Sequence, residues 1–306
     1  MEKVAIVGAG FVGSTAAYAL MIQGIAAEIA LIDIHKEKAE GEALDLEHGM
    51  QFTPESQIYF GDSYDLCANA DIVVVTAGVG QKPGETRLEL IEKNANIFKD
   101  IIPKIAKAAP NTVMLIITNP VDVLTYLAIK YSGFPASRVF GSGTTLDTAR
   151  FRHYIGDEFG VSPKSVHGYI LGEHGDSEFP AFSLTTIGGI HIEHCEGYAP
   201  GKLDECFKKT KNAAYEVINR KGATYYAIGL VISKLCRAVL NNEQRVYPVS
   251  NLIHNYYDEG DLCLSVPCVV GKGGIQRRFQ PPLNEEEQEK LHVSAQILRE
   301  ALAPYR

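Results

Sequence analysis

Residues 3–13 read KVAIVGAGFVG, a β-branched run that leads directly into three glycines spaced G-x-G-x-x-G. Residues 11–22 then have the composition of a helix. A strand, a glycine turn and a helix in this order form a dinucleotide-binding fingerprint. In such a turn Gly8 reverses the chain, Gly10 lets backbone amides approach a pyrophosphate, and Gly13 lets the helix pack on the strand.

A carboxylate stands where the second strand is expected to end. Residues 28–32 read EIALI, and Asp33 follows them, twenty residues beyond Gly13. A carboxylate at this point accepts the ribose hydroxyls of NAD and repels the extra phosphate of NADP. Glycine fingerprints also occur by chance in other α/β proteins, but Asp33 at this distance favours an NAD site.

The first half continues as alternating strands and helices. Strands are expected at 57–61, 71–77 and 112–118, and helices at 36–48 and 88–108. The unbroken Val and Ile of residues 72–75 indicate a strand covered on both faces, as in a parallel sheet. We therefore predict an α/β fold in which residues 1–142 form a Rossmann domain with a doubly wound parallel sheet.

The second half has a different pattern after a strand at 138–140 and the turn Gly141-Ser142-Gly143. Helices are expected at 144–155, 203–220, 223–240 and 284–302, and strands at 165–171, 182–187, 189–192, 245–253 and 262–270. The last two strands are predicted to pair with each other. Residues 143–306 are thus predicted to form an α+β substrate domain with antiparallel strands.

Length and composition fit two globular domains in 306 residues. The chain has 29 Lys and Arg against 37 Asp and Glu, and its net charge of −8 argues against nucleic acid or an anionic membrane as a partner. Six cysteines without a Cys-x-x-Cys pair favour reduced thiols. The chain opens directly into a strand and has no apolar run of about 18 residues, so we expect a cytoplasmic protein.

The strongest candidate for the chemistry is His174, within Gly172-Glu173-His174-Gly175-Asp176. Histidine exchanges protons near neutral pH, and the flanking glycines let the backbone approach a ligand. The strand expected at 165–171 would place the imidazole at a strand end, where open α/β folds bind ligands. A solvated or structurally satisfied histidine is the alternative interpretation.

Other polar residues have suitable positions to join His174. Asp147 and Arg150 lie one helical turn apart, so they form either a surface ion pair or, if they face His174, an orienting carboxylate and a carboxylate-binding guanidinium. The Gly- and Pro-rich residues 78–90 indicate a mobile lid carrying Gln81 and Arg87, or an ordinary surface loop. Asn119 follows the fifth strand and offers a donor and an acceptor.

A metal site is not expected. His191, His194 and Cys195 lie close together in sequence, but no second cluster supplies matching ligands.

Six motifs together resemble the NAD-dependent L-lactate dehydrogenases, and the likeness runs along nearly the whole chain. They are residues 8–13 (GAGFVG), Asp33, 81–87 (QKPGETR), 118–122 (TNPVD), 146–150 (LDTAR) and 172–176 (GEHGD). The resemblance implies that His174 exchanges a proton with pyruvate and L-lactate while NADH and NAD exchange a hydride. It also implies that Asp147 orients His174, Arg150 binds the substrate carboxylate and Arg87 polarises the carbonyl.

The resemblance also implies the remaining binding residues. Asn119 and Thr224 would line the substrate pocket, and cofactor contacts would come from Gly8, Gly10, Val12, Gly13, Asp33, Lys38, Tyr64, Gly78, Val79 and Asn119. Gln81 stands where malate dehydrogenases have an arginine for a second carboxylate. A neutral side chain there would leave that carboxylate buried without a countercharge, so pyruvate is the expected substrate.

Regulation and assembly are implied in the same way. Arg152 and His167 match positions that bacterial members of this family use to bind fructose 1,6-bisphosphate across a subunit interface. The resemblance therefore implies a glycolytic, fermentative homotetramer that this sugar phosphate activates as an allosteric enzyme. The alternatives are a malate or branched 2-hydroxy-acid dehydrogenase, and a non-catalytic NADH-binding redox sensor.

Overall fold

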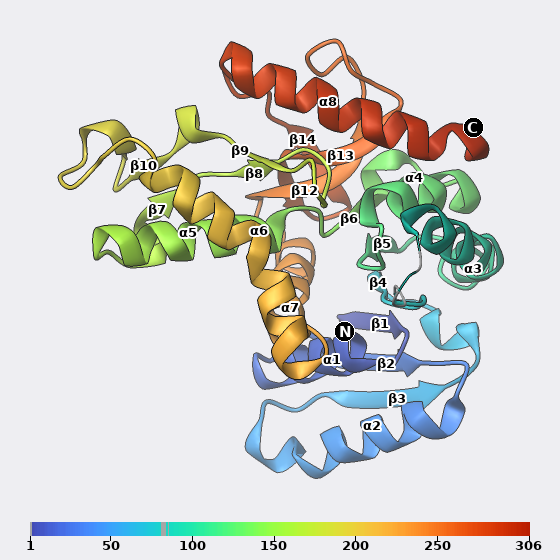
Figure 1. Cartoon of the computed structure of the whole chain (residues 1–306). Coiled ribbons are helices and arrows are strands. Elements are labelled where there is room, and N and C mark those ends of the chain that lie inside the picture. Colours follow the sequence, from blue (N-terminus) through green and yellow to red (C-terminus); the bar gives the residue numbers. More distant parts are fainter. Residues whose placement is uncertain (1, 81–83, 85) are drawn as a thin grey trace.

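A nine-stranded sheet forms the centre of the molecule in the computed structural model, which describes residues 2–80, 84 and 86–306 (Figure 1). The strand order is β14-β13-β12-β6-β5-β4-β1-β2-β3. Its parallel part comprises β1 (Lys3–Val7), β2 (Glu28–Ile32), β3 (Gln57–Gly61), β4 (Ile72–Val75), β5 (Val113–Ile116) and β6 (Val139–Gly141). This order reverses direction between β1 and β4, as in a doubly wound dinucleotide-binding sheet. The predicted fold class is confirmed.

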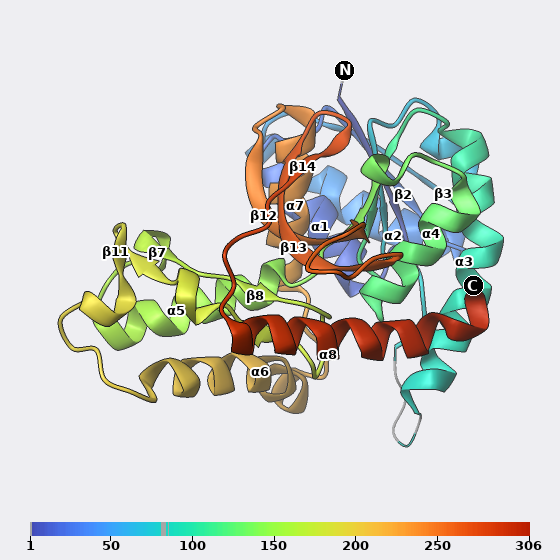
Figure 2. The ribbon, with the colours of Figure 1, turned by 90° about the horizontal axis from the view of Figure 1, so that it is seen from above.

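Helices cover both faces of the parallel strands. The helices of the first half are α1 (Phe11–Ile22), α2 (Lys36–His48), α3 (Arg87–Ala108) and α4 (Val121–Ser132). Helix α3 packs along α4 on one face, and α1 packs along α7 (Tyr226–Leu240) on the other, as Figures 1 and 2 show. All residues of β4 are at most 1% exposed, which explains its unbroken Val and Ile.

The antiparallel strands of the second half extend the same sheet. They are β12 (Arg245–Ile253), β13 (Leu262–Gly271) and β14 (Gly274–Arg278). Strand β12 joins the parallel strands through a pair between Ser250 and Gly141. A Cβ at Gly141 would lie 2.5 Å from Thr125 Oγ1 and 3.1 Å from Ser250 Cβ, so the missing side chain permits this close contact.

The predicted strand at 165–171 is wrong in its middle. The chain forms two short strands in different sheets: β7 (Val166–His167) pairs with β10 (Thr186–Ile187), and β8 (Ile170–Leu171) pairs with β9 (Phe179–Pro180). It crosses between them at Gly168, where a Cβ would lie 3.1 Å from Thr185 and 3.3 Å from Phe151. The close packing at this glycine separates the two strands.

Three other predicted boundaries are also corrected. Residues Phe182–Leu184 form a 3-10 turn instead of a strand. The Thr185 N–H donates a hydrogen bond to the carbonyl oxygen of Phe182, and the Thr185 hydroxyl donates one to the carbonyl oxygen of Ala181, which holds the chain in this turn. The expected strand at 189–192 is reduced to β11 (Ile190–His191), and the helix expected from residue 223 begins at Tyr226. The remaining helices are α5 (Thr145–Phe159), α6 (Lys202–Lys221) and α8 (Glu285–Leu302).

A second, smaller core lies under α5 and α6, built from Phe151, Ile155, Val166, Ile170, Ile192, Leu203 and Cys206. All six cysteines are free thiols, and five of them are buried. Among the described residues, no helix combines the length and apolar character needed to cross a bilayer.

Replacing Gly13 with Ala should destabilise the fold, because the added Cβ would lie 1.9 Å from the carbonyl oxygen of Gly8. Backbone atoms on both sides cannot rotate away, so we expect a loss of about 1–3 kcal/mol and a lower Tm in thermal unfolding. The matched control is Gly41→Ala in α2, where nothing lies within 4 Å of the new Cβ. That variant should gain about 0.5–1 kcal/mol, and equal Tm values for the two variants would contradict this account.

Candidate active site

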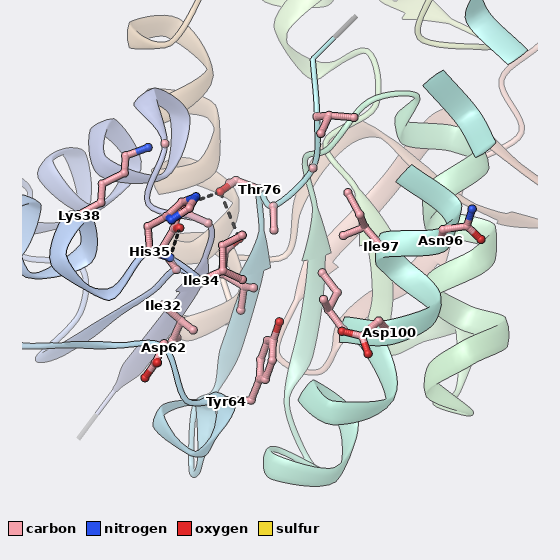
Figure 3. A pocket seen from close by; sticks show the side chains of 18 residues that line it. Ile32, Ile34, His35, Lys38, Asp62, Tyr64, Thr76, Asn96, Ile97 and Asp100 are labelled. Carbon is pink, nitrogen blue, oxygen red and sulfur yellow. Dashed lines mark hydrogen bonds between the residues drawn. The ribbon is translucent and has the colours of Figure 1, made fainter. Parts of the chain in front are cut away.

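A cavity of about 670 Å³ opens at the C-terminal ends of β1, β2 and β4 (Figure 3). The predicted cofactor residues that line it are Gly8, Gly10, Asp33, Lys38, Tyr64, Gly78 and Val79. Val12, Gly13 and Asn119 do not line it. Gly13 packs against Gly8 instead, and Val12 packs against the hydrophobic core.

The glycine turn presents donors and a cation to this cavity. Gly10 is the N-cap of α1 and has no side-chain cap, which leaves N–H groups of the first helical turn available for an anion. A Cβ on Gly10 would lie 4.0 Å from Lys38 Nζ, so an ammonium group stands beside the turn. These groups suit the pyrophosphate of a dinucleotide.

Asp33 supports the turn from the end of β2. Its Oδ2 accepts a hydrogen bond of 2.8 Å from the Ala9 N–H, and its Oδ1 accepts one of 3.0 Å from the His35 N–H. The carboxylate is therefore fixed at the cavity wall, and its remaining lone pairs suit ribose hydroxyls.

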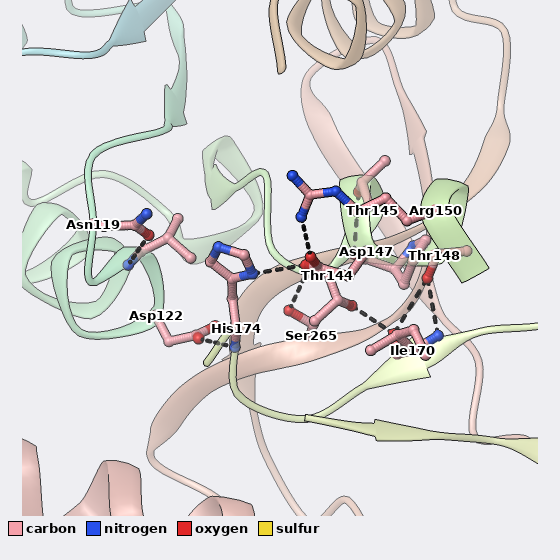
Figure 4. Close-up of polar contacts among 12 residues, drawn as sticks. Asn119, Asp122, Thr144, Thr145, Asp147, Thr148, Arg150, Ile170, His174 and Ser265 are labelled. Carbon is pink, nitrogen blue, oxygen red and sulfur yellow. Dashed lines mark hydrogen bonds and ion pairs between the residues drawn. The ribbon is translucent and has the colours of Figure 1, made fainter. Parts of the chain in front are cut away.

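The structure brings His174, Asp147 and Arg150 together (Figure 4). His174 Nδ1 lies 2.7 Å from Asp147 Oδ2, and Arg150 Nη1 donates a hydrogen bond of 2.9 Å to Asp147 Oδ1. Asp147 is 3% exposed and lies in the first turn of α5. The alternative of a surface ion pair between Asp147 and Arg150 does not fit this burial.

Three distant segments hold the turn that carries His174. Gly172 has φ +89° and exchanges backbone hydrogen bonds with Ser265 of β13. The Glu173 N–H donates to Ser294 Oγ of α8, and the His174 N–H donates to Asp122 Oδ2 of α4 at 2.7 Å. The backbone of the turn is thus fixed on both sides of the imidazole.

Electrostatics keep a proton on His174 at neutral pH. Burial lowers the pKa of His174, but the charge and hydrogen bond of Asp147, with smaller effects of Glu178 and Asp122, raise it to about 9. Burial raises the pKa of Asp147, yet the charges and hydrogen bonds of His174 and Arg150 outweigh this and hold it below its usual value. The pair is therefore an imidazolium and a carboxylate at pH 7.

Arg87 reaches this turn from the start of α3. Its guanidinium forms an ion pair with Glu173, whose side chain is 1% exposed. A Cβ on Gly175 would lie 3.5 Å from Arg87 Nη1, so the guanidinium lies against the His174 turn. The other lid residue predicted to contact substrate, Gln81, lies outside the described residues.

Asn94 and Asp122 are functional candidates that the sequence analysis missed. Asn94 of α3 is fully buried, accepts a hydrogen bond from the Val79 N–H at 2.8 Å, and donates to the carbonyl oxygens of Val79 and Asn119. It thereby fixes the cavity edge relative to Asn119. Burial raises the pKa of Asp122. Asp122 has a signal in the sequence, because it is the one acid in the mostly apolar residues 121–129 (VDVLTYLAI), whereas Asn94 lies among other polar residues and has none.

Thr224 has no hydrogen bond to the His174 cluster among the described residues. It lies in the connection between α6 and α7, where the next residue, Tyr225, stacks on Phe11 with ring centroids 5.2 Å apart. The connection therefore lies beside the start of α1.

Arg152 contacts the chain segment that contains His167. Arg152 Nε donates a hydrogen bond of 3.0 Å to the carbonyl oxygen of Gly168, next to the exposed His167. The Arg152 guanidinium also lies 5.4 Å from the ring centroid of Tyr169. Burial lowers the pKa of Arg152.

His191, His194 and Cys195 do not converge on a shared point within the described chain. The two rings have centroids 6.0 Å apart, and the Cys195 thiol donates to the carbonyl oxygens of Ile190 and His191.

Comparison with known proteins gives a consistent result over the whole chain. Residues 2–141 match the family model of the lactate/malate dehydrogenase NAD-binding domain, and residues 144–305 match that of the family's alpha/beta C-terminal domain. An L-lactate dehydrogenase of Clostridium botulinum (strain Loch Maree) is 48% identical over 305 residues, covering 98% of this chain and 96% of that protein. L-lactate dehydrogenase 1 of Clostridium acetobutylicum is also 48% identical, with 98% and 97% covered.

Solved structures agree with these relatives. The minor L-lactate dehydrogenase of Enterococcus mundtii, determined in a ligand-bound form, superposes with a TM-score of 0.96 at 46% identity, covering 100% of this chain and 98% of that one. MGS-M5, a lactate dehydrogenase from a Medee basin deep-sea metagenome, gives a TM-score of 0.95 at 44% identity, with 99% and 98% covered.

Replacing Asp147 with Asn should lower the pKa of His174 by about 1 to 3, because a neutral amide removes the charge that stabilises the imidazolium. NMR titration of the His174 ring should give a midpoint near 9 in the unmodified protein and a lower one in the variant. The control is Asp157→Asn on the same helix, since the side chain of Asp157 is 64% exposed and pairs with His153. An unchanged His174 midpoint in Asp147→Asn would refute the electrostatic assignment.

Proposed function

The chain belongs to the lactate/malate dehydrogenase family, and from this premise we propose that it is an L-lactate dehydrogenase. The reaction is the reversible transfer of a hydride between NADH and pyruvate, giving (S)-lactate and NAD. The observation that carries the proposal is the cluster of partly buried His174 and Arg150 around the buried Asp147, linked through Asp122 and Asn119 to the wall of the NAD cavity.

His174 is the acid and base of the proposed reaction. Bound NADH supplies the hydride, and protonated His174 gives its proton to the carbonyl oxygen of pyruvate. In lactate oxidation neutral His174 takes the hydroxyl proton back. Asp147 holds the ring through Nδ1 and stabilises the imidazolium, which leaves Nε2 to face the substrate.

Arg150 binds the substrate carboxylate. One terminal nitrogen donates to Asp147, and the rest of the guanidinium has no hydrogen-bond partner among the described residues, so it remains available for a carboxylate. Arg87 polarises the carbonyl, and its contact with the His174 turn supports this role. Asn119 and Thr224 complete the pocket.

Gln81 selects pyruvate over dicarboxylic substrates. A second carboxylate beside a neutral side chain would be desolvated without a countercharge, which costs several kcal/mol. The names of the relatives favour this choice over malate or branched 2-hydroxy acids. A non-catalytic redox sensor is disfavoured because the chain retains all four side chains proposed for the reaction, His174, Asp147, Arg150 and Arg87.

We also propose a domain division, a location, an assembly state and a regulatory site for this enzyme. Residues 1–142 bind NAD, with a lid at about 78–90, and residues 143–306 form the catalytic domain. Supporting this, the two family models meet between residues 141 and 144. The enzyme is a cytoplasmic homotetramer of glycolysis and fermentation. Arg152 and His167 bind fructose 1,6-bisphosphate, and the hydrogen bond from Arg152 to the carbonyl oxygen of Gly168, the residue after His167, supports a common anion site.

Substrate choice tests the catalytic proposal. Purified protein with NADH should give a higher kcat/KM for pyruvate than for oxaloacetate or 2-oxoisocaproate, measured by absorbance at about 340 nm, where NADH absorbs. Gln81→Arg should raise the ratio of kcat/KM for oxaloacetate to that for pyruvate by about 100- to 1,000-fold, because it supplies the missing countercharge. A preference of the unmodified protein for oxaloacetate would refute the assignment, and tight NADH binding without turnover would favour the sensor.

Activation by fructose 1,6-bisphosphate tests the second site. At saturating sugar bisphosphate the KM for pyruvate should fall by about 5- to 150-fold, and Arg152→Gln or His167→Gln should remove most of this change. Arg220→Gln is the matched control, since Arg220 is exposed on α6 and pairs only with Glu216 among the described residues. Equal activation of all three variants would exclude Arg152 and His167 from the site.

A further inference from the structure

Glu178 is a third acid of the active site to which neither the sequence nor the comparisons give a role. It follows the His174 turn and precedes β9, and it is 7% exposed. One of its carboxyl oxygens, a carboxyl oxygen of Asp147 and a ring nitrogen of His174 all lie within 4.8 Å of one another. No hydrogen bond or ion pair reaches its carboxyl group from the described residues, so the group has no fixed countercharge.

The surroundings of Glu178 oppose its ionisation. Burial and the nearby charge of Asp147 raise its pKa, His174, Lys211 and Arg150 lower it, and the balance lies at about 8. Lys211 is itself held by a hydrogen bond to the Asp176 carbonyl oxygen. The other charged groups in or beside the His174 turn are Asp122 and the ion pair of Arg87 with Glu173. With a pKa of about 8, the Glu178 carboxyl group is mostly protonated at pH 7 and about half ionised near pH 8.

The protonation state of Glu178 decides the charge that a substrate meets. With Glu178 neutral, the positive charges of His174 and Arg150 exceed the single negative charge of Asp147 by one. A 2-oxo monocarboxylate neutralises this excess when it binds. With Glu178 ionised, the excess disappears, and the substrate carboxylate loses its electrostatic attraction in a region of low dielectric constant.

We propose that Glu178 is a positioning residue whose carboxylate takes up a proton when the substrate carboxylate binds. The protein groups of the pocket then carry one more positive than negative charge. This inference rests on the proposed reaction. Between pH 8 and 9 the pocket takes up a proton from solvent onto the Glu178 carboxylate as pyruvate enters. The proton on Glu178 affects only substrate binding, so its loss at high pH raises the KM for pyruvate. Deprotonation of His174 also removes the proton that the reaction transfers.

The pH profile distinguishes the two groups. In the unmodified enzyme, kcat/KM for pyruvate should begin to fall near pH 8. Above about pH 9 the fall should have the steepness expected when two groups, Glu178 and His174, have lost their protons. Glu178→Gln keeps the side chain neutral, so its fall should involve one proton only, with a KM that no longer rises from pH 8. Glu178→Asp retains an acid and should retain the two-proton fall. Glu193→Gln, an exposed acid on another loop, should match the unmodified enzyme.

Proton uptake gives a readout that needs no turnover. Oxamate, an unreactive analogue of pyruvate, is added to the NADH complex at pH 8 in weak buffer with a pH indicator. The unmodified enzyme should take up about half a proton per site, since half of Glu178 is ionised there. Glu178→Gln should take up clearly less.

Failure of this inference and failure of the proposed function look different. An enzyme that oxidises NADH with pyruvate, but shows the same pH profile and proton uptake with Gln at position 178, would overturn the role of Glu178 alone. A protein that neither reduces pyruvate nor binds oxamate would overturn the proposed function. If the variants do not fold, carbon-13 NMR of the glutamate-labelled unmodified protein decides: one carboxyl group should titrate near pH 8, and none doing so would refute the proposal.

Discussion

A hydrogen bond between the partly buried His174 and the buried Asp147 is the contact on which the rest of the site depends. It joins the turn after β8 to the first turn of α5, in a place where an unpaired charge would be strongly unfavourable. A buried ion pair repays its desolvation only when its geometry is fixed and its other lone pairs are satisfied. Arg150, on the same helix α5, donates a hydrogen bond to the second carboxylate oxygen of Asp147. Both oxygens of this carboxylate therefore have a partner before any substrate is bound.

The scaffold fixes this geometry by tying the turn to elements from the whole chain. The turn exchanges backbone hydrogen bonds with Ser265 of β13, and its N–H groups donate to the side chains of Asp122 in α4 and Ser294 in α8. Helix α4 begins two residues after Asn119, whose carbonyl oxygen accepts a hydrogen bond from Asn94 at the edge of the NAD cavity. The same short connections therefore fix the imidazole and the cofactor wall relative to each other, as hydride transfer requires.

The sequence predicts what depends on local patterns and misses what depends on tertiary contacts. Local patterns include the glycine turn, the Val-rich strands and the i, i+3 spacing of Asp147 and Arg150. They predict the parallel sheet and the pairing of Asp147 with Arg150. The crossing at Gly168 depends on Phe151 and Thr185 packing against it, and no periodicity encodes this contact. Asn94 and Glu178 are distant or unremarkable in sequence, and only folding shows that one bridges two loops and the other faces Asp147.

Three acids around one imidazole explain how a single site can serve both directions of a proton transfer. Asp147 is ionised at neutral pH because the charges and hydrogen bonds of His174 and Arg150 hold its pKa below the usual value, whereas burial raises the pKa of both Asp122 and Glu178. If all three were ionised, the imidazolium would be so strongly stabilised that it could not release its proton. If none were, the ring would lose its proton near neutral pH, because burial lowers its pKa. One carboxylate of lowered pKa beside two acids of raised pKa leaves the proton bound firmly enough to be present and weakly enough to be transferred.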